Sequence, residues 1–256
     1  MKGCTLRRAL RFVLVVFGVA TVAFAVPFAT ASAALPTPTA GQQVVDVQPA
    51  IGSTVGVGAP ITVTYAGPVP DRVAAERSLQ VSSPRNATGT VQWLSDTVMQ
   101  WTPKTYWPAH APVKFSVGGM PLSFDVGTSV VGVADISAHT FTVSIDGVVA
   151  REMPASMGKP KHPTPVGSFT ALGKENPVIM DSRTIGIPLD DPEGYKLTVN
   201  YAVRVTWGGV YVHSAPWSVA SQGYANVSHG CINLSPDNAA WYYDQVSIGD
   251  PIIINA

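Results

Sequence analysis

The sequence predicts a mostly-β protein in which an antiparallel β-sandwich precedes a second β-rich domain that carries one or two helices. Short β-branched runs recur about every 10 to 15 residues over residues 44–126, with Gly and Pro turns between them. The strand-like pattern continues after residue 130, where one capped helical pattern also stands near the C-terminus. A chain of 256 residues is long enough for two such domains.

The first 33 residues are expected to be an export signal. Arg7, Arg8 and Arg11 precede an uncharged run from Phe12 to Ala29, and residues 31–33 (Ala-Ser-Ala) offer a small-x-small cleavage site. An uncleaved membrane anchor is the alternative, because about 18 apolar residues can just span a bilayer. The two adjacent arginines also leave twin-arginine export open beside the general secretory route.

Charge composition argues against a nucleic-acid-binding function. Lys+Arg and Asp+Glu number 16 each, and four of the basic residues lie in the first eleven positions. Cleavage of the signal therefore leaves 12 basic and 16 acidic residues, a net charge of −4. A weakly acidic body without a Lys/Arg block argues against nucleic acid as a partner.

Cysteine usage isolates one thiol. The chain has two cysteines, and Cys4 lies in the predicted signal. The exported body thus keeps only Cys231, which excludes an internal disulfide and a two-Cys, two-His zinc site. From the count alone, a buried inert thiol is the ordinary interpretation, so the residues around Cys231 must decide.

The N-terminal half is expected to be structural. Residues 34–43 are rich in Pro, Thr, Ala and Gly and suit a flexible tether. A sandwich domain over residues 44–127 follows, and nothing in it resembles a catalytic constellation. Its expected strands are residues 44–47, 61–65, 79–81, 90–93, 98–101 and 113–117.

Residues 130–256 form the second expected domain. Residues 140–145 alternate and lead into Asp146-Gly147, which is typical of a tight hairpin turn. A strand pair is expected over residues 201–207 and 210–213. Ser235 can cap a helix whose first turn holds Pro236, and residues 252–254 read as a buried closing strand.

Reactive side chains gather near the C-terminus. A strand ending at His213 and another ending at Cys231 would bring an imidazole beside a thiol, and the imidazole would convert the thiol to the attacking thiolate. A backbone carbonyl can orient the other nitrogen of the imidazole. Gly230 permits close approach to a substrate, and the Gly230 and Cys231 amides are expected to face a developing oxyanion.

These residues carry a resemblance to the L,D-transpeptidase catalytic domain, the YkuD-like family. His213, a loop, and Ser228-His229-Gly230-Cys231 match its pattern of a His followed by [Ser/Thr]-His-Gly-Cys. Upstream, residues 156–158 and 164–169 match its S-x-G and T-P-x-G-x-F elements. The resemblance covers residue 130 to the end. The preceding sandwich is similar to the single immunoglobulin-like domain of the mycobacterial-type branch.

The resemblance implies a cysteine acyltransferase of the cell wall. Cys231 would cleave the bond between the third residue of a peptidoglycan stem tetrapeptide and its terminal D-Ala, and a second stem would accept the acyl group in a 3→3 crosslink. Such enzymes need no metal or nucleotide, and carbapenem-type β-lactams acylate the same Cys. The protein would act in a periplasm-like space or the cell wall, and would contact a membrane only through an uncleaved N-terminal segment.

Roles for further residues follow from the resemblance. His213 matches the general base, and the carbonyl of Ser214 is expected to orient it. His229 could help to position the site or could be structural, and a side-chain role for Ser214 stays open. Residues expected to contact the substrate are Met180, Tyr195, Gly208, Gly209, Trp217 and Asn233. Asn233 departs from the wider family, where Arg is usual, which weakens any argument for an ionic clamp there.

Two other functions stay open: an L,D-carboxypeptidase that trims D-Ala with water as acceptor, and a wall-binding protein with a degenerate site. The His213 and Cys231 pair argues against the second. His139 and His162 are expected to be ordinary surface histidines.

Overall fold

The computed structural model describes residues 43–82 and 87–256. The predicted export signal, and all of the predicted tether except its last residue, lie outside the described residues. Within the described part of the chain, no helix combines the length and apolarity that crossing a bilayer requires. Strands β1 to β19, two α-helices and short 3-10 helices make up the regular structure there, so the mostly-β prediction is confirmed.

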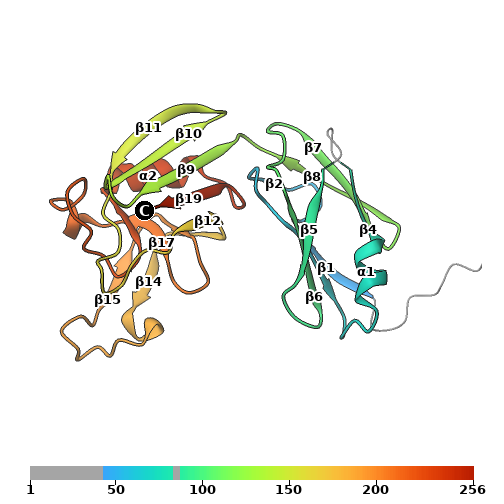
Figure 1. Ribbon diagram of the computed structural model, residues 1–256, viewed down its shortest axis with the longest axis horizontal. Helices are drawn as coiled ribbons and strands as arrows, with labels where there is room; N and C mark the ends of the chain where they lie inside the picture. The colour runs from blue at the N-terminus through green and yellow to red at the C-terminus, as the bar shows by residue number, and fades with distance from the viewer. Residues whose placement is uncertain (1–42, 83–86) are drawn as a thin grey trace, which may run out of the picture. The chain divides into compact units, whose positions relative to one another are not determined.

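The N-terminal half is a sandwich of two four-stranded sheets (Figure 1). One sheet has the order β1 (Val44–Gln48), β3 (Ile61–Tyr65), β6 (Val98–Pro103), β5 (Gly89–Trp93). The other has the order β2 (Thr54–Val55), β8 (Met120–Val126), β7 (Pro112–Val117), β4 (Leu79–Ser82). Alternate residues of β3 and β7 are buried, as a strand with one face on a core requires. Stacked Trp101 and Trp107, with ring centroids 5.4 Å apart, lie in that core.

One element of the sandwich was not anticipated. Helix α1 (Arg72–Ser78) begins after Asp71, whose carboxylate accepts a hydrogen bond from the Ala74 amide at 2.9 Å. Asp is a favoured N-cap residue because its side chain satisfies an amide that the helix leaves unpaired. The helix has seven residues and buries only Ala75, so its apolar periodicity is too short to register in the sequence.

The C-terminal half is built on two sheets. The larger has the order β11 (Val148–Pro154), β10 (Thr140–Ile145), β9 (Val130–Asp135), β19 (Pro251–Asn255), β12 (Gly167–Thr170). The predicted hairpin turn is confirmed: Asp146 and Gly147 both have positive φ, 48° and 83°, between β10 and β11. The predicted closing strand is β19, which pairs parallel with β9 and antiparallel with β12.

The smaller sheet supports the reactive residues. Its order is β13 (Gly173–Glu175), β16 (Ala202–Arg204), β17 (Tyr211–Ser214), β18 (Ile232–Leu234). Helix α2 (Pro236–Gln245) begins as predicted, with the Ser235 hydroxyl accepting from the Asn238 amide. Side chains of both sheets and of α2 form one buried cluster, in which Phe141 meets Tyr242 edge to face with centroids 4.9 Å apart. This core fixes β17 and β18 in place.

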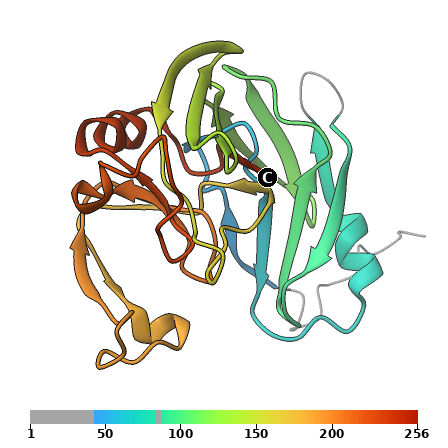
Figure 2. The ribbon, with the colours of Figure 1, turned by 60° about the vertical axis from the view of Figure 1, so that its left-hand side comes forward.

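A hairpin stands apart from both sheets. Strands β14 (Val178–Asp181) and β15 (Lys196–Val199) pair only with each other, and the 3-10 helix η2 (Ser182–Ile185) lies in the loop between them. We call residues 178–199 the flap, and Figure 2 shows it projecting from the rest of the C-terminal half. Because an isolated two-stranded hairpin is at best marginally stable in water, contacts with the body must hold the flap in position.

Candidate active site

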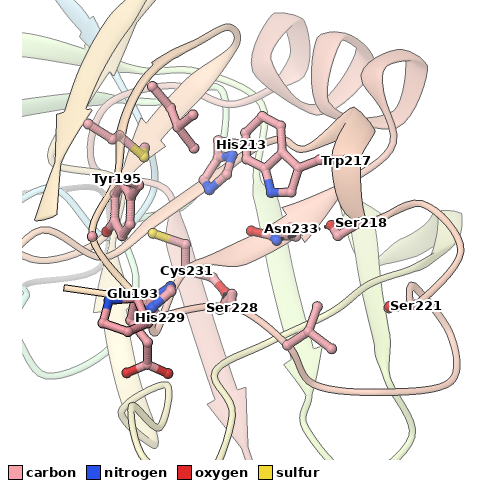
Figure 3. A pocket seen from close by; sticks show the side chains of 15 residues that line it. Glu193, Tyr195, His213, Trp217, Ser218, Ser221, Ser228, His229, Cys231 and Asn233 are labelled. Atoms are coloured by element: carbon pink, nitrogen blue, oxygen red, sulfur yellow. Dashed lines mark hydrogen bonds between the residues drawn. The ribbon is translucent and has the colours of Figure 1, made fainter. Parts of the chain in front are cut away.

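Parallel pairing of β17 with β18 places the imidazole near the thiol. His213 pairs with Asn233 in this register, and Cys231 lies two residues before Asn233. Residues two apart point to the same face of an extended chain, so Cys231 and Asn233 both face the cavity that His213 also lines (Figure 3). The expectation that each strand ends at its reactive residue is wrong, because His213 lies inside β17 and Cys231 precedes β18.

A tight turn holds Cys231. The Ser228 hydroxyl donates to the Cys231 carbonyl oxygen at 2.6 Å and accepts from the Gly230 amide at 3.0 Å. Gly230 has a φ of 117°, a backbone conformation that L side chains rarely adopt. Because Ser228 already accepts from the Gly230 amide, the expectation that this amide faces an oxyanion is wrong.

The upstream motif residues brace the same turn. The Thr164 hydroxyl donates to the Gly230 carbonyl oxygen at 2.9 Å and accepts from the Gly158 amide at 2.8 Å. A Cβ at Gly158 would lie 2.1 Å from the His162 carbonyl oxygen, so only glycine fits there. The Ser156 hydroxyl donates to the Ala225 carbonyl oxygen at 2.7 Å. The S-x-G and T-P-x-G elements therefore act as scaffold around Cys231.

The buried His213 ring has one defined tautomer. Its Nδ1 lies 2.9 Å from the carbonyl oxygen of Ser214. A carbonyl only accepts, so Nδ1 carries the proton and Nε2 is left as an acceptor. Burial lowers the pKa of His213 to about 4, against the opposing effect of the Ser214 hydrogen bond. The ring is therefore neutral near pH 7, and Ser214 contributes through its backbone.

The Cys231 thiol is also neutral in this structure. Burial raises its pKa to about 11, although a backbone hydrogen bond from Tyr211 acts in the opposite direction. The thiol points to the Gly209 carbonyl oxygen at 3.7 Å. Among the described residues, no hydrogen bond joins this thiol to His213. The resting pair is thus a thiol and a neutral imidazole rather than a thiolate and an imidazolium.

Two cavities share a wall, and Cys231 lines the first of them. The first has a volume of about 390 Å³ and is lined by His213, Cys231 and four of the predicted substrate contacts: Met180, Tyr195, Trp217 and Asn233. The second, of about 440 Å³, is lined by Gly208 and Gly209. Met180 and Tyr195 belong to both and form the wall between them.

Asn233 is a buried residue in the wall of the first cavity. Its Nδ2 donates to the Ser218 hydroxyl at 3.1 Å, and the residue is only 3% exposed. Within the described residues its Oδ1 atom accepts no hydrogen bond. A buried polar atom without a partner is costly, and this amide oxygen has almost no exposed surface. Trp217, which is 54% exposed on the 3-10 helix η3 (Pro216–Ser218), lies beside the His213 ring with centroids 6.0 Å apart.

His229 belongs to a charged cluster that the sequence did not reveal. Glu193 of the flap accepts hydrogen bonds from Lys159, from Lys161 at 2.6 Å and from His162 at 3.2 Å. His162 is therefore not an ordinary surface histidine, because its ring also lies 5.0 Å from that of His229. We call Lys159, Lys161, His162, Glu193 and His229 the Glu193 cluster.

A partial signal for this cluster exists in the sequence. Lys159, Lys161 and His162 lie within four positions of a sparsely charged chain. Their partner Glu193 follows 31 residues after His162, so the pairing itself depends on the fold. In the same cluster, burial lowers the pKa of His229, and Lys159 and His162 add to this effect.

Family comparisons cover nearly all of the chain. Residues 129–254 match the L,D-transpeptidase catalytic domain, and residues 23–118 match a bacterial Ig domain. L,D-transpeptidase 1 of Mycobacterium tuberculosis is 56% identical over 247 residues, which span 96% of this chain and 98% of the relative.

Solved structures agree in fold. An L,D-transpeptidase, LdtMt1, in complex with imipenem superposes with a TM-score of 0.81 at 60% identity, covering 83% of this chain and 99% of that one. L,D-transpeptidase 3 from Mycobacterium tuberculosis, in complex with a faropenem-derived adduct, gives a TM-score of 0.81 at 51% identity, covering 85% and 100%. With this fold, this sequence similarity and the motif residues gathered around Cys231, the chain belongs to the L,D-transpeptidase family.

Proposed function

We propose that this enzyme of the L,D-transpeptidase family forms 3→3 crosslinks in peptidoglycan, with Cys231 as nucleophile and His213 as general base. The observation that carries the proposal is the His213 tautomer. Because Nδ1 donates to the Ser214 carbonyl oxygen, Nε2 can accept a proton on the side of the cavity that holds the thiol.

The first step is acyl transfer to sulfur. Cys231 Sγ attacks the carbonyl carbon of the third stem residue, and the thiol proton passes to His213 Nε2. The C–N bond to the terminal D-Ala then breaks, and the departing amine takes that proton. A thioester remains on Cys231. Neutral resting states of both groups favour proton transfer during the attack over an ion pair formed in advance.

Charge that develops on the carbonyl oxygen needs donors. Tyr195 is a candidate, because its ring lines both cavities beside Cys231. Burial raises the pKa of Tyr195, so the hydroxyl keeps its proton. The Cys231 amide is the remaining backbone candidate, since the Gly230 amide is engaged by Ser228. Each such donor contributes roughly 3 to 4 kcal/mol in the transition state.

The second step needs room for another stem. The side-chain amine of its third residue attacks the thioester carbon and forms the new amide bond. The C–S bond breaks, and a proton from the amine passes through His213 Nε2 to the departing sulfur, which restores the thiol. The first cavity is lined by Cys231, and the second adjoins it across the wall formed by Met180 and Tyr195, which supports the binding of two peptides on neighbouring surfaces. Asn233 lines the first cavity together with Cys231, which supports a contact between this residue and the donor stem.

Two further expectations belong to the same proposal. Carbapenem-type β-lactams are expected to acylate Cys231, in line with the related enzymes solved with imipenem and with a faropenem-derived adduct. Export to a periplasm-like space or the cell wall would bring the enzyme to this substrate. The residues 1–33 that support export carry the charged and apolar pattern of a signal.

Product analysis tests the proposal. Purified protein is incubated with a disaccharide-tetrapeptide ending in D-Ala, beside a Cys231→Ala control, and products are identified by mass spectrometry. We expect a dimer that has lost one D-Ala, and none from the control. Tripeptide without dimer would reassign the chain as an L,D-carboxypeptidase, and no product from either protein would favour a wall-binding role.

A further inference from the structure

The flap has one polar connection to the body of its domain. Ser182 bonds to Tyr195 and Ile187, and Asp181 pairs with Arg183, all within the flap. Among the hydrogen bonds of the described residues, every one that joins the flap to the body is accepted by the carboxylate of Glu193. Since β14 and β15 pair only with each other, this carboxylate supplies the polar part of the flap's attachment.

Glu193 takes part in charge-assisted hydrogen bonds, which are stronger than those between neutral groups. Both carboxylate oxygens are used: Oε1 accepts from Lys159, and Oε2 accepts from Lys161 and His162. Hydrogen bonds between charged groups are roughly twice as strong as neutral ones. The hydrogen bonds from Lys159 and Lys161 hold the pKa of Glu193 far below its usual range, so it is ionised at any pH where the enzyme works. With two ammonium groups on its oxygens, Glu193 is an ion-pair centre and not a ready metal ligand.

The same cluster extends toward the reactive cysteine through a series of neighbouring, tilted rings. His162 lies 5.0 Å from His229, and His229 lies 5.1 Å from Tyr195, measured between ring centroids. Tyr195 follows Glu193 by two residues in the sequence. The contacts therefore run from Glu193 to His162, then to His229, and return to the flap at Tyr195. Figure 3 shows Glu193 and His229 on one side of Cys231, with Tyr195 beside them.

We infer that Glu193 is a positioning residue for the acylation step: through Lys159, Lys161 and His162 it holds the flap closed, with Tyr195 against His229 beside Cys231. Glu193 need not touch the reacting atoms, because its effect passes through Tyr195 and through the cavity wall that the flap supplies. This inference rests on the proposed role of Cys231 as nucleophile.

Two rates measured on one thiol test the inference. Acylation of Cys231 by the tetrapeptide donor needs the closed flap, whereas alkylation by iodoacetamide needs only access to sulfur. For Glu193→Gln we expect acylation to fall about tenfold while alkylation stays equal or becomes faster. Lys161→Met, which changes an exposed partner of Glu193, is expected to move acylation in the same direction by a smaller factor.

Asp190→Asn is the matched control, because it removes the same charge from an exposed position of the flap. It should leave both rates within twofold of the wild-type values. Unchanged acylation in Glu193→Gln and Lys161→Met, or a parallel fall of acylation and alkylation, overturns the inference. Failure of the proposed function looks different, since the wild-type protein itself would then show no acylation that Cys231→Ala abolishes.

Discussion

Burial sets the chemistry of the two reactive side chains. His213 sits in β17 with its Nδ1 on the Ser214 carbonyl oxygen, and the surrounding core lowers its pKa to about 4. The same burial raises the pKa of Cys231 to about 11. Loss of water disfavours both charged forms, so each group holds its neutral state across the physiological range.

The neutral pair predicts a flat pH profile. His213 accepts a proton only while it is unprotonated, so the acylation rate should fall as pH drops toward its pKa of about 4. Between about pH 6 and 9 the rate should change less than threefold, because neither group titrates there. Stopped-flow acylation by a carbapenem across this range measures it. A rise with a midpoint near pH 7 would instead indicate a thiolate formed before attack.

His213→Gln should slow acylation by 10² to 10⁴-fold, the usual range for loss of a general base. The carboxamide can keep a hydrogen bond in the cavity but cannot take the thiol proton. Single-turnover acylation followed by mass spectrometry gives the rate. A loss of less than tenfold would mean that the proton leaves Cys231 by another route.

Ser228→Ala should disturb the turn that holds Cys231. The change removes the hydroxyl that joins the Cys231 carbonyl and the Gly230 amide, which leaves both groups unpaired at a cost of about 1–3 kcal/mol. Ser228→Thr keeps the hydroxyl and is the control. The Tm and the acylation rate should both fall in the Ala variant and stay close to the wild-type values in the Thr variant. Equal Tm values and equal rates in the two variants would contradict the role given to this turn.

At the scale of secondary-structure elements, the sequence predicted the features that neighbouring residues determine: turns, helix caps and a buried strand. The Asp146-Gly147 turn, the Ser235 cap of α2 and the closing strand β19 were all predicted and are confirmed. Helix α1 was missed because seven residues with one buried side chain leave no periodic signal. The flap was missed as a unit because nothing in β14 or β15 alone indicates that they pair only with each other.

In the site, too, features set by the local sequence were predicted, whereas features set by the packing of distant segments were not. The spacing of His213 and Cys231 predicted that they would share a cavity, and the resemblance to a known family pointed to the Ser214 carbonyl that orients the ring. The use of the Gly230 amide by Ser228 and the pairing of Glu193 with Lys159 depend on how distant segments pack. Such tertiary pairing leaves no signal in the local sequence.

Because the 156–164 loop is closely packed, we expect that Gly158 cannot be replaced by a larger residue without loss of stability. Gly158→Ala would place a Cβ 2.1 Å from the His162 carbonyl oxygen, and such overpacking typically costs 1–3 kcal/mol. For a chain of this size we expect Tm to fall by roughly 2–12 °C. Gly173→Ala is the control, because the nearest atom to its added Cβ lies 4.0 Å away. Calorimetry that finds equal Tm values for both variants would contradict this packing.

At the scale of the whole molecule, the predicted export signal precedes the sandwich domain, and the catalytic domain follows. Cleavage after Ala33 should release residues 34–256. Intact-mass analysis of the protein recovered from outside the cytoplasm of a producing bacterium measures this directly. A full-length mass in the membrane fraction would favour the uncleaved anchor.

The central claim is that Cys231 is the acylated nucleophile. Its most direct test is to mix the purified protein with a carbapenem and map the added mass by peptide sequencing in a mass spectrometer. The account predicts one adduct, on the peptide that carries Cys231, and none in Cys231→Ala with its fold intact. An adduct on another residue, or the same adduct in the Cys231→Ala protein, would contradict it.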